Sequence, residues 1–232
     1  ICQCPAWNYD SAYADPCAGR TSVLYGRNLR MELKSHCRER FEPAVDAIRQ
    51  LLEEKKDSDE PLLAAIDGRC GSGKTTLGEY LKQVFDCNLF RMDDFFLRME
   101  QRTPERLREV GGNVDYERFE ETVLRPLLQK ERVCYQSFSC QKWGLLKAYP
   151  IPYKRLNIIE GSYSMHPYFK NPYQIRVFLN ISPKDQIENI KKRNGLEKAK
   201  QFQNMWIPKE EAYFEKFHVM DDAIQIMWDL KL

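Results

Sequence analysis

Residues 62–76 read LLAAIDGRCGSGKTT. The first five form a continuous apolar run, which is typical of a parallel strand buried on both faces. Residues 68–75 then match G-x-x-x-x-G-K-[ST] at every fixed position. An apolar strand before such a loop and an amphipathic helix after it, here at about 74–85, are the context that a phosphate-binding loop requires. The stretch therefore predicts a strand, a loop for nucleotide phosphates and a helix.

The residue types of this loop have separable physical roles. Glycines let the backbone curl so that successive N–H groups point inward at phosphate oxygens, and the helix adds its positive N-terminal end. Lys74 is expected to reach the β- and γ-phosphates, and the Thr75 hydroxyl to coordinate Mg²⁺. The predicted nucleotide-binding set is Gly68, Gly71, Ser72, Gly73, Lys74, Thr75 and Thr76.

The chain after the loop alternates between strand-like and helix-like segments. Strands are predicted at 88–92, 133–138, 156–159, 174–181 and 223–227, and helices at 115–130, 183–194 and 208–217. Ser182 and Pro183 suit a helix N-cap and first turn, whereas Pro126 should bend or restart its helix. This alternation predicts an α/β fold with a mostly parallel sheet and helices on both faces.

The length of 232 residues suits one sizeable domain. We assign residues 61–232 to it and residues 1–60 to an N-terminal extension ending in a docking helix, because residues 1–35 lack a sustained period. Phe41, Val45, Ile48 and Leu52 then recur at helical spacing. Four cysteines (2, 4, 17 and 37) with His36 lie in this extension. They lack the paired C-x₂-C spacing of structural zinc sites, so free thiols in a reducing cytoplasm are the favoured interpretation.

Composition excludes several classes of protein. With 43% hydrophobic and 30% charged residues, the chain can form a core and does not resemble a disordered one. Its formal charge of +2 argues against a dedicated nucleic-acid binder. The longest apolar run, 62–66, falls short of the roughly 18 residues of a membrane helix. No secretory signal pattern is present. We therefore expect a cytoplasmic protein with a small-molecule substrate, no nucleic acid or membrane partner, and a homo-oligomeric state left open.

An acidic pair, Asp93 and Asp94, directly follows the second predicted strand. The carboxyl ends of strands border the ligand crevice of an open α/β sheet, so these side chains should face it. A carboxylate there can accept the proton of a hydroxyl that attacks the γ-phosphate, and Asp93 is our candidate. The alternative is that either residue caps the next turn, an interpretation that is stronger for Asp94.

A second acid, Glu160, ends the apolar strand at 156–159 and precedes Gly161. This is the position of a Walker B acid, which holds Mg²⁺ through water; the alternative is a strand-end Glu facing solvent. The sequence contains no Asn-Lys-x-Asp motif for reading guanine, which disfavours a GTPase.

The motifs at 68–76, 93–95, 113–115, 135–138 and 158–161 occur in an order that resembles the uridine kinase, phosphoribulokinase and pantothenate kinase group of P-loop kinases, and most of all bacterial uridine kinase-like proteins. The resemblance covers roughly residues 62–226. It implies the three-layer P-loop NTPase fold and Mg²⁺-dependent transfer of the ATP γ-phosphoryl to a hydroxyl, first of all the 5′-hydroxyl of uridine or cytidine.

The resemblance also implies residue roles. It makes Asp93 the general base, Glu160 the Mg²⁺-associated acid, Asp115 a ligand of sugar hydroxyls, Tyr135 a wall of the acceptor pocket and Arg193 the catalytic cation of a lid. From the residues alone, Asp115 is equally a helix N-cap, Tyr135 a core residue of a strand, and Arg193 a solvated residue at a helix C-terminus.

Two departures from the group leave the acceptor open. Residues 196–206 lack further lid arginines, and residues 139–143 lack the His that helps uridine kinases read the base. Gln141 and Trp143 stand there instead. One alternative is a kinase of the same fold for another alcohol, such as pantothenate or a sugar phosphate. The other is a nucleotide-binding regulator or ATPase without an acceptor.

Overall fold

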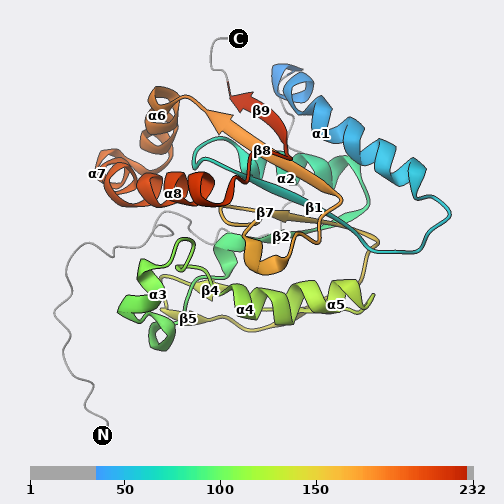
Figure 1. The fold of residues 1–232 in the computed structure, drawn as a ribbon, viewed down its shortest axis with the longest axis horizontal. Coiled ribbons are helices and arrows are strands. Elements are labelled where there is room, and N and C mark those ends of the chain that lie inside the picture. The colour runs from blue at the N-terminus through green and yellow to red at the C-terminus, as the bar shows by residue number, and fades with distance from the viewer. Residues whose placement is uncertain (1–34, 229–232) are drawn as a thin grey trace, which may run out of the picture.

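A five-stranded parallel sheet forms the centre of the computed structural model, which describes residues 35–228 (Figure 1). The strand order is β2-β7-β1-β8-β9, and every pairing is parallel. The strands are β1 Leu62–Gly68, β2 Cys87–Arg91, β7 Leu156–Glu160, β8 Ile175–Ile181 and β9 Ile224–Trp228. The predicted α/β fold is confirmed, and five of the six predicted strands belong to this sheet.

The sheet carries helices on both faces because side chains alternate along each strand. On β1, Leu62, Ala64 and Ile66 pack with α1 (Ser35–Glu54) and α2 (Lys74–Val84). Leu63 and Ala65 face the opposite core, which includes side chains of α8 (Ile207–Phe217) and of the helical run at 116–128. Two hydrophobic cores thus separate three layers; in Figure 1, α1 lies above the sheet and α4 and α5 lie below it.

Helix α1 docks on the sheet through the apolar stripe that the sequence predicts. Phe41, Val45 and Ile48 are fully buried against strands that include β8 and β9. The helix begins at Ser35, before the first residue of that stripe, and Pro43 lies inside it. Residues 1–34 and the side chains of 35–37 lie outside the described part of the chain, as do residues 229–232. The predictions for residues 1–34 and for the four cysteines and His36 therefore lie outside the described residues, and the boundary at residue 60 stays a prediction.

The helix predicted at 115–130 is a single helical run with a change of type. It consists of α4 (Tyr116–Phe119), the π-helical turn η4 (Glu120–Leu124) and α5 (Arg125–Leu128). Pro126 lies in the first turn of α5, where its missing N–H is tolerated. The predicted restart corresponds to the start of α5 at Arg125, which follows the π-helical turn directly and without a break in the helical run.

The strand predicted at 133–138 is not part of the central sheet. It divides into β3 (Val133–Tyr135) and β4 (Phe138–Ser139), which pair antiparallel with β6 (Tyr149–Ile151) and β5 (Gly144–Leu145). Burial alternates along β3, with Cys134 exposed between two buried residues, whereas the strands β1 and β7 are buried throughout. Alternation is typical of an antiparallel strand with one face on a core, which explains the difference.

The remaining elements connect these layers. Short helical turns are η2 (Met92–Asp94), η3 (Met99–Gln101), α3 (Pro104–Arg108) and η5 (Pro167–Phe169). After β8 come α6 (Pro183–Asn194), α7 (Leu196–Gln201) and the π-helical turn η6 (Phe202–Trp206). Ser182 caps α6 as predicted, since its hydroxyl accepts the Asp185 N–H at 3.1 Å. Among residues 35–228, no helix combines the length and the apolar character needed to cross a membrane.

The buried, hydrogen-bonded ring of His166 predicts that the stability of the fold depends on pH. Its Nδ1 accepts the backbone N–H of Tyr168, and its Nε2 lies 3.2 Å from the carbonyl oxygen of Val110, so the neutral ring protonated on Nε2 satisfies both partners. Burial lowers the pKa of His166 below its ordinary value of 6.5. At a pH between the lowered pKa of folded His166 and the ordinary value of 6.5, the unfolded chain binds more protons than the folded one. The free energy of unfolding should therefore fall as the pH drops below 6.5.

The variant His166→Asn tests this expectation because asparagine can keep the bond to the Tyr168 N–H without titrating. Urea unfolding at several pH values should show a shallower loss of stability on acidification, the difference from wild type being at most about 1.4 kcal/mol per pH unit. The control is His218→Asn, since His218 is exposed and its φ of 49° suits asparagine. Equal pH slopes for His166→Asn and wild type would contradict the assignment.

Candidate phosphoryl-transfer site

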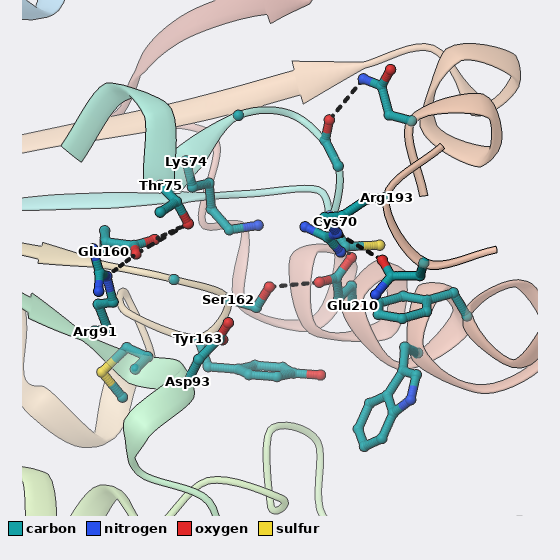
Figure 2. A pocket seen from close by; sticks show the side chains of 18 of the residues that line it. Cys70, Lys74, Thr75, Arg91, Asp93, Glu160, Ser162, Tyr163, Arg193 and Glu210 are labelled. Atoms are coloured by element: carbon teal, nitrogen blue, oxygen red, sulfur yellow. Dashed lines mark hydrogen bonds and ion pairs between the residues drawn. The ribbon is translucent and has the colours of Figure 1, made fainter. Parts of the chain in front are cut away.

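A cavity of about 640 Å³ opens at the carboxyl ends of β1, β2 and β7. One wall is the loop between β1 and α2, and another comes from α6 and η6 (Figure 2). Residues predicted to bind phosphate, to hold a metal and to accept a proton therefore line one cavity, although they lie far apart in the sequence, from Gly71 to Glu160.

The phosphate-binding loop has a backbone that favours glycine. Gly68 has a φ of 132°, and a Cβ there would lie 2.1 Å from the carbonyl oxygen of Leu179, so this strand end tolerates no side chain. Gly73 has a φ of 96° and is the N-cap of α2, without any side chain capping the helix. The amide groups of the first turn of α2 are thus left to an external acceptor, which is the arrangement that binds phosphate.

Most of the predicted nucleotide-binding residues line the cavity, and two of them are buried behind it. Its lining includes Gly71, Gly73, Lys74, Thr75 and Thr76, whereas Gly68 and Ser72 are buried behind it. The Lys74 ammonium group donates to the carbonyl oxygens of Gly68 at 2.6 Å and Arg69 at 3.1 Å. Lys74 is therefore held inside the loop by its own backbone, beside the place where phosphate oxygens would bind.

Thr75 and Glu160 lie together, as a metal site requires. The Thr75 hydroxyl donates to Glu160 Oε1 at 3.2 Å, and Glu160 is only 3% exposed at the end of β7. The solvent-facing alternative for Glu160 is therefore wrong. Hydroxyl and carboxylate oxygens are the donor type that Mg²⁺ prefers, so these two residues fit the metal.

Arg91, which the sequence reasoning missed, is the partner that compensates the buried charge of Glu160. Its Nε donates to Glu160 Oε1 at 3.2 Å, and its Nη2 pairs with Glu79 of α2. The residue ends β2, two positions before Asp93, and lies across from Glu160 in the β2–β7 register. Its position at a strand end beside the acidic pair is the signal that could have identified it.

Asp93 lines the cavity, whereas Asp94 is turned to a structural partner. Both belong to the short turn η2 at the end of β2. Asp94 Oδ2 accepts the hydroxyl of Tyr135 at 2.7 Å, which ties η2 to β3. Of the two acids, Asp93 is the one positioned to meet a substrate.

Asp115 and Tyr135 lie behind the cavity wall. Asp115 is 1% exposed, caps α4 and pairs with the Arg118 guanidinium at 3.2 Å. Tyr135 is 4% exposed within the core, and burial raises the pKa of its hydroxyl well above the usual value. The N-cap and core interpretations are thus confirmed. The roles of both residues toward a substrate stay predictions, and Asn113 and Val114 are the neighbours of Asp115 that do line the cavity.

Arg193 lines the cavity from the end of α6, with Lys192 and Asn194 beside it. Its Nε donates to Asn194 Oδ1 at 2.7 Å, and the side chain is otherwise exposed. Earlier in α6, Asn189 donates to the carbonyl oxygen of Gly71 at 3.0 Å. This helix therefore bonds directly to the phosphate-binding loop and presents a guanidinium toward it.

Glu210 of α8 is a further residue that the sequence did not reveal. It is 4% exposed, accepts the Cys70 backbone N–H at 2.9 Å and accepts the Ser162 hydroxyl at 2.5 Å (Figure 2). Burial, and next the charge of Glu210, raise the pKa of the Cys70 thiol well above the usual value, so this thiol stays protonated. No motif marks a glutamate within an ordinary amphipathic helix, which is why the residue escaped notice.

Solved structures with this arrangement of elements include two proteins whose names mark them as possible kinases. A possible uridine kinase from Bacillus stearothermophilus superposes with a TM-score of 0.62 at 18% identity, covering 84% of this chain and all of that one. A protein provisionally named as a fructose transport system kinase, from Silicibacter, gives a TM-score of 0.57 at 20% identity, covering 73% of this chain and 90% of that one. No protein-family model and no curated protein matches the sequence. The chain has the three-layer α/β fold of P-loop kinases.

Proposed function

We propose that the protein is a small-molecule kinase that transfers the γ-phosphoryl group of ATP to an alcohol. The observation that carries this proposal is that Asp93 and the phosphate-binding loop line the same cavity. A switch that only binds nucleotide has no need for a carboxylate that accepts the proton of a hydroxyl. A kinase does need one, placed across from the phosphate being transferred.

Different residues of the chain have different roles in phosphoryl transfer. Backbone N–H groups of 71–76 bind the phosphates, and the Lys74 ammonium group neutralises their negative charge. Asp93 takes the proton of the attacking hydroxyl, and the Arg193 guanidinium stabilises charge on the transferring group from α6. Thr75 and Glu160 would hold Mg²⁺, which when bound offsets charge on the phosphate oxygens.

The favoured acceptor is the 5′-hydroxyl of a nucleoside, uridine or cytidine first. This preference rests on the order of motifs in the sequence, to which the name of the Bacillus stearothermophilus protein adds support. The lack of a histidine among residues 139–143 favours a second candidate, another alcohol such as pantothenate or a sugar phosphate. The name of the Silicibacter protein is in keeping with a sugar-type acceptor.

A panel of acceptors separates these candidates from a regulator or ATPase. ADP release from ATP and Mg²⁺ is measured with no acceptor, then with uridine, cytidine, pantothenate and several sugar phosphates. We expect release to depend on one acceptor class, with a phosphorylated product identified by mass spectrometry. Release that is equal with and without every acceptor, or no release at all, would contradict the kinase proposal.

A further inference from the structure

Helix α1 reaches the phosphate-binding loop through one side chain, Arg40. The Nη2 group of Arg40 donates to the carbonyl oxygen of Ser72 at 3.0 Å. Arg40 precedes the alternating strands and helices, and its partner lies 32 positions along the chain inside the loop. The phosphate-binding loop is therefore supported from outside the catalytic domain assigned from the sequence.

The Arg40 guanidinium is itself held in place by aromatic rings. It stacks on Trp228 with 3.9 Å between Cζ and the ring centroid, and lies 4.9 Å from the ring centroid of Phe41. Trp228 ends β9 and lines the cavity, while Phe41 is fully buried in the core. A guanidinium stacked in this way loses little further freedom when it donates a hydrogen bond.

The bond from Arg40 fixes the orientation of one peptide unit. The peptide between Ser72 and Gly73 is trans and planar, so its C=O and N–H point in opposite directions. With the carbonyl held by Arg40, the Gly73 N–H is directed away from α1. A Cβ on Gly73 would lie 3.0 Å from a ring carbon of Trp228 and 3.9 Å from Arg40 Nη2, so both side chains pack closely on this peptide.

We propose that Arg40 is a positioning residue for nucleotide phosphates, acting through the Ser72–Gly73 peptide. By holding the carbonyl outward it keeps the Gly73 N–H turned toward the phosphate side, where glycine's wide choice of φ would otherwise allow the peptide to rotate. Arg40 is not among the residues that line the cavity, so it acts on the ligand only through the loop. The inference rests on the proposed nucleotide-binding function.

The test compares Arg40→Met, Arg40→Lys and the control Arg49→Met. Arg49 lies on the same helix, is exposed, and binds Glu42 and Asp46 of that helix. ATP affinity is measured by calorimetry, followed by kcat and the KM for ATP with the active acceptor and by thermal unfolding of each variant. Arg40→Met should raise Kd and KM by about tenfold, as for the loss of a hydrogen bond from a charged donor, with kcat changed less than about twofold.

Arg40→Lys should recover part of the affinity, because an ammonium group can still donate to the Ser72 carbonyl but cannot stack flat on Trp228. Arg49→Met should behave as wild type. Wild-type affinity in Arg40→Met, or an affinity in Arg40→Lys as low as in Arg40→Met, would overturn the positioning role. A fall in kcat at constant KM would overturn it as well. If the wild-type protein binds no ATP, the proposed function fails first, and the inference fails with it.

Discussion

Replacing Asp93 with asparagine is expected to lower kcat for phosphoryl transfer by about 10²-fold or more, while ATP still binds. Asparagine keeps the size and hydrogen-bonding capacity of the side chain but cannot take the proton from the attacking hydroxyl. Asp93 lines the same cavity as the phosphate-binding loop, whereas Asp94 does not line it. The measurement is acceptor-dependent ADP release at saturating ATP, together with the Kd for ATP.

The neighbouring Asp94→Asn variant is the matched control. Asp94 accepts the hydroxyl of Tyr135, a bond that asparagine can preserve through its carbonyl oxygen, so kcat should stay close to wild type. If Asp94→Asn abolished turnover while Asp93→Asn left kcat unchanged, the general base would have to be Asp94. An unchanged kcat in both variants would remove the acidic pair from the mechanism.

Replacing Lys74 with methionine is expected to reduce kcat/KM for ATP by about 10²-fold or more. Methionine is of similar length but carries no charge, so the variant loses the cation that neutralises the β- and γ-phosphates. It also loses the two bonds from the Lys74 ammonium group to the carbonyl oxygens of Gly68 and Arg69. Steady-state kinetics with varied ATP and a direct binding assay measure both consequences.

Lys82→Met provides the control for Lys74→Met, since Lys82 lies exposed in the last turn of the same helix. It should retain wild-type kinetics. Thermal unfolding distinguishes a catalytic loss from a damaged loop: a large fall in the unfolding temperature of Lys74→Met would mean that its bonds inside the loop stabilise the fold. Unchanged ATP binding and turnover in Lys74→Met would contradict the assignment of this cavity to phosphates.

Local signals in the sequence were enough to predict the sheet and the loop. The structure of the apolar run at 62–66 and of the glycines after it depends on residues close by in the sequence. For this reason β1 and the start of α2 lie where they were expected. The sequence also predicted that Asp93 and Glu160 would lie at strand ends. Strand ends in a parallel sheet meet at one edge, which brings such residues together.

What escaped prediction depends on contacts between distant segments. Arg91 compensates the charge of Glu160 because β2 and β7 pair in a register that places the two residues side by side. Glu210 bonds to the phosphate-binding loop because α8 packs against that loop. The segment at 133–138 looked like one more parallel strand because its partners, β5 and β6, are too short to be recognised from periodicity. Asp115 fitted both an N-cap and a ligand, and only its bonds to Arg118 show that it caps α4.

The segment that carries Arg193 forms hydrogen bonds with the phosphate-binding loop near both of its ends. Asn189 of α6 bonds to Gly71, and Glu210 of α8 bonds to the next residue back, Cys70. The stretch between Asn189 and Glu210 is thus attached to the phosphate-binding loop at both of its ends. For this stretch to move away from the phosphate-binding loop, both of these hydrogen bonds would have to break.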